Sequence, residues 1–317
     1  MISTAILCSG QGAQSAAMFD LLADAPEAES VFLAAKRALG GKDPRDLVHQ
    51  ASSEAIHLDK AGQILCCTQA MAAWSVIGPL LAHPLLVAGY SVGELAAWGV
   101  AGLMDASGVL DLAVQRAEAM DNATIEPSGL VAIRGLTQTA LLPICKSHGA
   151  YVSIINASDQ CLVGGTQASL AHVVVDAIAA GAVHTTMLPV TVASHTPLLA
   201  AASATFHQKL MTAPMLSTVP TGIRLLSGID GAAVFNVRSG CAKLACQIQQ
   251  TVDWAACIDS CRAAGVTKII ELGPGSALAR LVHEAMPYAD VHSLSEFHTL
   301  AGFVKWATNG SYAANAR

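Results

Sequence analysis

The sequence predicts an α/β protein in which a large domain with a parallel sheet carries a smaller inserted domain. Three observations predict this fold. Short apolar runs at residues 4–8, 85–89 and 267–275 are each followed by glycine-bearing turns and helical periodicity, a pattern typical of buried parallel strands with helices on both faces. The middle of the chain changes to a β-α-β-β-α-β order. A G-x-S-x-G pattern joins the second apolar run to a helix.

The inserted domain is predicted from consecutive segments of alternating type. We expect a strand at 129–136, a helix at 137–149, strands at 150–158 and 160–165, a helix at 166–181 and a strand at 182–190. Thr166 is a plausible N-cap for the second helix, and Gly181 follows its end. This is the ferredoxin-like order. We place it at residues 125–192, between the two parts of the large domain at 1–124 and 193–317. A ligand-binding cleft is expected where the two domains meet.

Composition narrows the classes of function. Residues 70–90 are the most apolar window, but Pro79, His83 and Pro84 interrupt it, so a buried helix, a turn and a core strand are expected rather than a membrane span. The net charge of −6 without a basic block argues against nucleic acid as a partner. The nine cysteines lack zinc spacing, so we expect reduced, mostly buried thiols and no metal. No signal peptide is apparent, and a cytoplasmic location is expected.

The segment Gly89-Tyr90-Ser91-Val92-Gly93 fits the nucleophile elbow of α/β-hydrolase-like folds. A turn this sharp strains the backbone at the serine, and side chains two residues before or after it would collide with neighbouring backbone. The two glycines therefore leave the Ser91 hydroxyl exposed above the strand end. The helix that follows directs free N–H groups at the same point, so the Val92 N–H is placed to bind an oxyanion.

A serine nucleophile needs a base, and eleven histidines compete for that role. His195 lies in "VTVASHTPLL", where the chain re-enters the large domain among small polar residues. His283 is the alternative, because ordinary α/β-hydrolases carry a C-terminal histidine. The loop "GQGAQ" after the first strand lacks the third glycine of a dinucleotide loop, since Ser15 stands there. It can instead bring the backbone N–H of Gln11 close to a reacting centre.

Arg116 is the most informative charged residue. The segment 106–120 has an apolar stripe that includes Val109, Leu112 and Met120, and Arg116 falls within that stripe. A guanidinium cannot lose its charge, so it needs an anionic or hydrogen-bonding partner there. Two interpretations remain open: an internal ion pair with a carboxylate, or a fork that binds a substrate carboxylate.

Seven motifs then occur in one order along nearly the whole chain: "GQGAQ", "GYSVGE", "QRAEAM", "INAS", "VASH", "QIQQTVDW" and "ELGPGSAL". In this the chain resembles the malonyl-CoA:acyl carrier protein transacylase family, and within it most closely the acyltransferase (epsilon) subunit of malonate decarboxylase. The resemblance implies an acylated nucleophile at Ser91 with His195 as its general base. It also implies that the backbone carbonyl of Gln247 orients the histidine, so that a Ser-His dyad needs no aspartate.

The remaining roles also follow from the resemblance. Arg116 would bind the free carboxylate of the malonyl group, Gln11 and Val92 would supply oxyanion-hole N–H groups, and Asn156 would lie near the substrate. The family's fatty-acid-synthesis enzymes usually carry histidine before the nucleophile, where this chain has Tyr90. That departure favours the decarboxylase subunit and leaves the carrier and acyl preference open.

The expected reaction is a two-step transfer of a malonyl group from malonyl-CoA to the thiol of a carrier protein. The resemblance implies no permanently bound cofactor, and a carrier whose prosthetic group is of the phosphopantetheine type. Other malonate decarboxylase subunits are possible partners. The alternatives are the transacylase of fatty-acid synthesis, a serine thioesterase or hydrolase that uses water in the second step, and an inert scaffold subunit.

Overall fold

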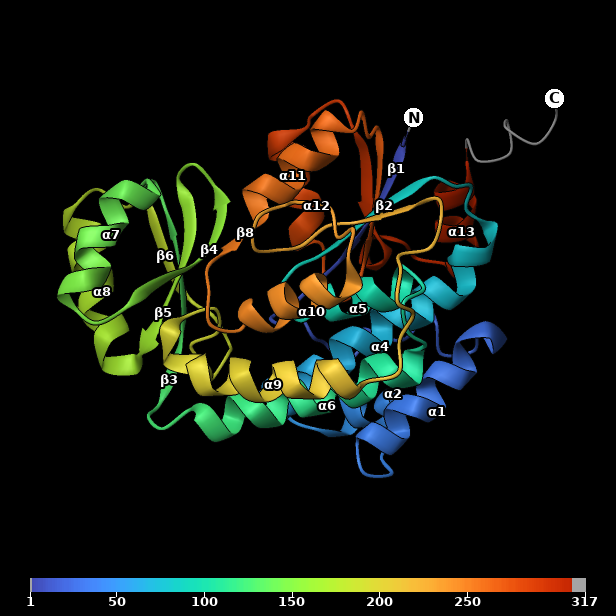
Figure 1. Ribbon diagram of the computed structural model, residues 1–317, viewed down its shortest axis with the longest axis horizontal. Helices are drawn as coiled ribbons and strands as arrows, with labels where there is room; N and C mark the ends of the chain where they lie inside the picture. Colours follow the sequence, from blue (N-terminus) through green and yellow to red (C-terminus); the bar gives the residue numbers. More distant parts are fainter. Residues whose placement is uncertain (1, 310–317) are drawn as a thin grey trace.

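The computed structural model describes residues 2–309, so the end of the predicted large domain lies outside the described residues. It confirms the α/β fold: five parallel strands form one sheet, the large sheet, in the order β10-β9-β1-β2-β7 (Figure 1). The three predicted strands are its centre. The strands are β1 (Thr4–Cys8), β2 (Leu85–Gly89), β7 (Ile223–Leu225), β9 (Lys268–Leu272) and β10 (Asp290–Ser293).

Helices cover both faces of the large sheet because side chains alternate along each strand. In β1, Ile6 and Cys8 pack into one core cluster and Ala5 and Leu7 into another. The first cluster is shared with α1 (Glu29–Ala38), α4 (Asp59–Ile77), α5 (Gly93–Val100), α6 (Ala106–Ala123), α9 (Ala200–Thr212), α10 (Val237–Cys246) and α13 (Leu300–Thr308). The second is shared with α11 (Trp254–Ala263) and α12 (Ala277–Ala285). The short elements are η1 (Pro26–Ala28), α2 (Pro44–Gln50), α3 (Ser53–His57), η2 (Gly78–Leu80), η3 (Pro197–Leu199) and η4 (Leu294–Glu296).

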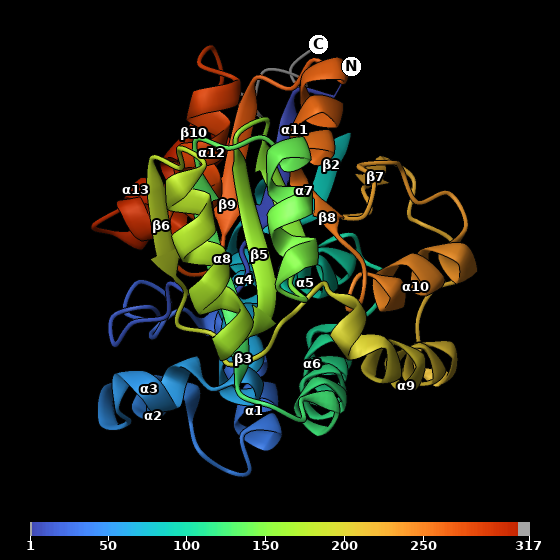
Figure 2. The same cartoon turned by 90° about the vertical axis from the view of Figure 1, so that its left-hand side faces the viewer.

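A second, small sheet has the order β6-β3-β5-β4-β8. Its first four strands are antiparallel neighbours in the predicted ferredoxin-like arrangement. Helices α7 and α8 cover the face that is turned away from the large sheet (Figures 1 and 2). The elements are β3 (Ser128–Arg134), α7 (Gln138–Ser147), β4 (Tyr151–Ala157), β5 (Gln160–Thr166), α8 (Gln167–Ala179), β6 (His184–Met187) and β8 (Val252–Asp253).

Strand β8 ties the two units together, because it comes from beyond residue 193 and pairs in parallel with β4. The opposite face of the small sheet packs on the large unit through Leu130, Ile154 and Leu162. The predicted helix, turn and strand in 70–90 are the end of α4, η2 and β2. Among the described residues one helix, Asp59–Leu80, has the length and composition of a membrane span, and 72% of its apolar window is buried inside the protein. All nine cysteines are free, and eight of them are buried.

Candidate active site

The G-x-S-x-G segment forms the sharp turn that the sequence predicts. β2 ends at Gly89, Ser91 has a φ of 55°, and α5 begins at Gly93. A Cβ on Gly89 would lie 2.1 Å from the Gly93 carbonyl oxygen, and one on Gly93 would lie 2.1 Å from the Cys8 carbonyl oxygen. Only glycine fits at both positions, which lets α5 start directly against β1 and places Ser91 in a left-handed conformation that is costly for a serine.

His195 lies against Ser91 in hydrogen-bonding distance. Its Nε2 is 2.8 Å from Ser91 Oγ, and its Nδ1 is 2.6 Å from the Gln247 carbonyl oxygen. A carbonyl can only accept, so Nδ1 carries the proton and the Nε2 lone pair faces the serine hydroxyl. The structure therefore brings Ser91, His195 and Gln247 together in the tautomer that a general base needs. His283, the alternative histidine, is exposed on α12 and does not line the cavity around Ser91.

Burial keeps this imidazole neutral. His195 is 1% exposed, and burial, reinforced by the nearby Arg116 charge, lowers its pKa to about 3 against the opposing effect of the Gln247 hydrogen bond. A neutral Nε2 is available to accept a proton throughout the physiological range.

The loop that carries Gln11 approaches the elbow closely. A Cβ on Gly10 would lie 2.8 Å from the Tyr90 carbonyl oxygen and 3.5 Å from Ser91 Cβ. Ser9 fixes the loop, since its hydroxyl donates to Glu271 at 2.6 Å. Among residues 2–309, neither the Gln11 N–H nor the Val92 N–H donates a hydrogen bond to the protein. Two free backbone donors thus lie beside the serine.

Arg116 is buried at 1% exposure and forms no internal ion pair within the described chain. Its Nη1 donates to Gln63 Oε1 at 2.7 Å and its Nη2 to Gln247 Oε1 at 3.4 Å, while its Nε has no partner among the residues described. Burial lowers its pKa, but a guanidinium remains charged. Arg116 does not itself line the cavity around Ser91. Gln247 connects it to the site, because Gln247 accepts from Arg116 and is hydrogen-bonded to His195 and to the Ser91 carbonyl.

A cavity of about 450 Å³ surrounds Ser91 at the junction of the two sheets. Gln11, Tyr90, Asn156 and His195 line it. The Tyr90 hydroxyl donates to Asn156 Oδ1 at 3.1 Å, so the large and small units are linked at the cavity wall. No group of three metal-ligating side chains occurs in residues 2–309.

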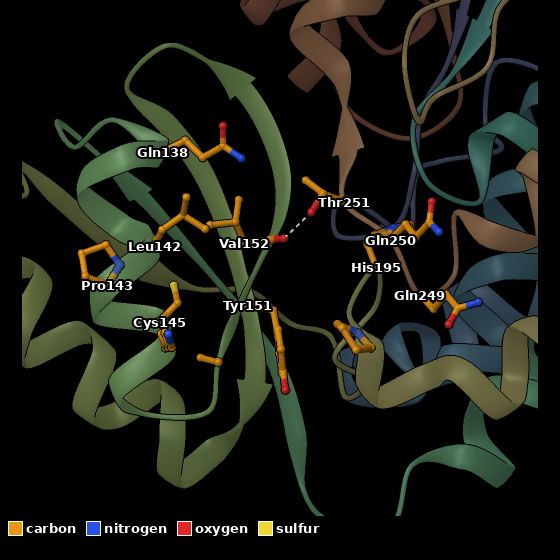
Figure 3. A pocket seen from close by; sticks show the side chains of 13 residues that line it. Gln138, Leu142, Pro143, Cys145, Tyr151, Val152, His195, Gln249, Gln250 and Thr251 are labelled. Atoms are coloured by element: carbon orange, nitrogen blue, oxygen red, sulfur yellow. Dashed lines mark hydrogen bonds between the residues drawn. The ribbon is translucent and has the colours of Figure 1, made fainter.

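A second hollow of about 710 Å³ lies on another side of the junction, between α7 and β4 of the small unit and residues 249–251 of the large unit (Figure 3). The hydroxyl of Thr251 donates to the Val152 carbonyl at 2.8 Å across it. His195 reaches this hollow as well, but Ser91 does not line it. The candidate active site is therefore the smaller cavity.

Three buried polar residues near the site were not predicted. Glu94, 1% exposed, accepts from the Gly228 N–H at 3.0 Å and from the side-chain amide of Gln247. Gln63 and Asp59 lie on α4, where the Gln63 amide donates to Asp59 Oδ2 at 2.7 Å. A carboxylate inside the otherwise apolar segment "ELAAWGV" was the available signal for Glu94.

A serine on a strand-to-helix elbow, bonded to a neutral histidine beside free backbone donors, defines an α/β enzyme of the acyl-transferring or acyl-hydrolysing class. The model of the acyl transferase domain family matches residues 6–305. Malonyl CoA-acyl carrier protein transacylase of Salmonella typhimurium is 28% identical over 306 residues, 93% of this chain and 97% of that protein. The protein of that name from Mycobacterium tuberculosis (strain H37Rv) is 29% identical over 304 residues, 94% and 99%.

Solved structures agree. The acyl-carrier-protein S-malonyltransferase of Burkholderia pseudomallei superposes with a TM-score of 0.87 at 28% identity, covering 96% of this chain and all of that one. MCAT of Mycobacterium tuberculosis gives 0.87 at 27% identity, covering 96% and 99%. The chain belongs to the acyl transferase domain family, and it is an acyltransferase. The resemblance inferred from the seven motifs is confirmed at this level, and the likeness to the decarboxylase subunit stays a prediction.

Proposed function

We propose that the protein transfers a malonyl group from malonyl-CoA, through an ester on Ser91, to the thiol of a carrier protein. The observation that carries this proposal is the pairing of a neutral His195 Nε2, 2.8 Å from Ser91 Oγ, with a buried arginine that has no ion-pair partner among residues 2–309. The relatives named above as malonyl CoA-acyl carrier protein transacylases support the same substrate and acceptor.

In the first half-reaction, Ser91 Oγ attacks the thioester carbonyl while His195 Nε2 takes the hydroxyl proton. The N–H groups of Gln11 and Val92 hold the oxyanion, a contact worth about 3 kcal/mol per donor. The C–S bond then breaks, and His195 returns the proton to the departing thiolate. The carrier thiol attacks the ester in the second half-reaction with the same proton shuttle. Water must be excluded from the ester, because otherwise the enzyme becomes a hydrolase.

Arg116 selects the acyl group in this scheme. Nε and Nη2 form one edge of the guanidinium plane, and among residues 2–309 the one hydrogen bond of that edge is the 3.4 Å contact to Gln247. Because Arg116 does not line the cavity, a malonyl carboxylate would reach this edge by displacing the side-chain oxygen of Gln247, and two parallel donors would then bind it. An acetyl group has no carboxylate and would leave this edge with only its long contact to Gln247. Asn156, fixed by Tyr90, would donate its free NH₂ to an acceptor oxygen of the substrate.

We further propose that the physiological acceptor is the malonate decarboxylase carrier, which bears a phosphoribosyl-dephospho-CoA group, and that other subunits of that enzyme are partners. Tyr90 at the position before the nucleophile supports this acceptor. The phosphopantetheine carrier of fatty-acid synthesis is the second candidate, and the names of the relatives favour it. We place the protein in the cytoplasm in either setting, and neither setting needs a resident cofactor.

The test is a transfer assay in which radiolabelled malonyl-CoA is offered with either carrier, using the wild type and Ser91→Ala. We expect transfer to at least one carrier by the wild type and none by the variant. Steady release of malonate without transfer would instead identify a hydrolase. No labelling of either carrier by both proteins would identify an inert scaffold, and equal labelling of carrier by Ser91→Ala would show that Ser91 is not the nucleophile. A kcat/KM at least as high with the phosphopantetheine carrier would overturn the assignment of the decarboxylase carrier.

A further inference from the structure

Arg116 is held in the core by neutral amides. Its two hydrogen-bond acceptors are Gln63 Oε1 at 2.7 Å and Gln247 Oε1 at 3.4 Å. No described carboxylate forms a salt bridge with it. A buried guanidinium is ordinarily paired directly with a carboxylate, because an uncompensated charge in the interior is costly. The countercharge must therefore lie further away.

The side-chain NH₂ group of each glutamine donates a hydrogen bond to a buried carboxylate. The Gln63 amide donates to Asp59 Oδ2 at 2.7 Å, and the Gln247 amide donates to Glu94 Oε2. Asp59 is 6% exposed and Glu94 1%. A carboxylate only accepts and a guanidinium only donates, so each glutamine can satisfy both neighbours in a single orientation. Two relays of the form carboxylate, glutamine, arginine thus converge on Arg116 from α4 and α5.

We infer that Asp59 and Glu94 are positioning residues for acyl selection: through Gln63 and Gln247 they orient Arg116 and offset its charge, yet leave it without a direct anionic partner. This inference rests on the proposed function. A substrate carboxylate can then bind the guanidinium by displacing a long contact to a neutral amide. If either carboxylate touched Arg116 directly, the substrate would have to break a buried ion pair first.

The electrostatics agree with this geometry. Burial raises the pKa of Asp59 to about 6 and that of Glu94 to about 7, and the Arg116 charge opposes the rise at both. Each carboxylate therefore interacts with the Arg116 charge although no salt bridge joins them in the described residues. The two relays differ in one respect, because Gln247 also holds His195 and the Ser91 carbonyl. The Asp59 relay has no hydrogen bond to Ser91 or His195 within residues 2–309. The Gln11 amide donates to the backbone carbonyl of Asp59, and a change confined to the Asp59 side chain keeps that acceptor. The Asp59 relay is therefore the one to test.

The test compares kcat and KM for malonyl-CoA and acetyl-CoA in the wild type, Asp59→Asn and Gln63→Glu. Asp59→Asn removes the countercharge and allows the Gln63 amide to flip, so KM for malonyl-CoA should rise about tenfold, the lower end of the loss seen when the partner that orients a metal ligand is removed. Gln63→Glu places a carboxylate directly on Arg116 and should raise that KM at least as much. The kinetic constants for acetyl-CoA should change little in either variant, which also shows that the site is folded.

Asp121→Asn is the matched control, because Asp121 raises the pKa of Asp59 through its charge but is not part of the relay. It should leave the preference for malonyl-CoA unchanged. An unaltered malonyl-to-acetyl ratio in both relay variants would overturn the inference, and so would an equal loss in Asp121→Asn. Failure of the wild type itself to transfer malonyl groups would be a different result, because it would refute the proposed function.

Discussion

Replacing Arg116 by alanine gives the sharpest test of how the acyl group is chosen. The side chain is 1% exposed, and its Nε and Nη2 edge has no partner closer than 3.4 Å. A malonyl carboxylate on this edge would make two charge-assisted hydrogen bonds, each worth about 1.5–3 kcal/mol. Their loss amounts to about 3–6 kcal/mol, or a factor of about 10² to 10⁴ in kcat/KM for malonyl-CoA.

The assay is the ratio of kcat/KM for malonyl-CoA to that for acetyl-CoA, with one carrier protein as acceptor. In Arg116→Ala, activity on acetyl-CoA should hold or rise, because an acetyl group has no carboxylate for the guanidinium to bind. Arg116→Lys keeps the charge but not the fork and should give an intermediate ratio. A ratio equal to that of the wild type in Arg116→Ala would refute the reasoning and leave Arg116 with a structural role.

Two further predictions concern the elbow and the histidine. Gly93→Ala should lower the free energy of unfolding by more than about 4 kcal/mol, since the new Cβ would lie 2.1 Å from the Cys8 carbonyl oxygen. Urea unfolding measures this loss, with Gly108→Ala in α6 as the control, because a Cβ there has room. Equal stability of the two variants would contradict the prediction. His195 should remain neutral from pH 8 to pH 5 in an ¹⁵N NMR titration assigned with His195→Gln, because burial lowers its pKa to about 3. As the pH falls from 6.5 towards 3, His195 is protonated in the unfolded chain but stays neutral in the folded chain. This residue therefore lowers the free energy of unfolding over that pH range. A midpoint near 6.5 in the folded protein would be inconsistent with its burial.

The parts of the fold that could be predicted are those that depend on residues close together in the sequence. Continuous apolar runs identified β1, β2 and β9, and two glycines around Ser91 identified the elbow. Strands β7, β8 and β10 have two to four residues each and carry polar side chains such as Arg224, Asp253 and His292. Such segments become strands only because their backbone groups form hydrogen bonds with a neighbouring strand. The residues of the segment itself do not show that such a neighbour exists.

The residues of the candidate site also fall into those that the sequence indicates and those that it does not. Residue type and position indicated Ser91, His195 and Arg116, whose chemistry is unusual for their surroundings. The partners of Arg116 could not be foreseen, because Gln63 and Gln247 are 53 and 131 positions away from it in the chain. The local pattern assigns Glu94 no role in the site, and the structure buries it against Gln247. Tertiary contacts between distant segments decide these roles.

The most direct test of the central claim is to locate the acyl group on the enzyme. The protein is incubated with malonyl-CoA without a carrier, quenched in acid, digested and analysed by tandem mass spectrometry. We predict one malonyl ester, on the peptide that contains Ser91, which transfers on adding carrier and is absent in Ser91→Ala. A malonyl group on another residue, or transfer to the carrier without any enzyme-bound ester, would contradict the account.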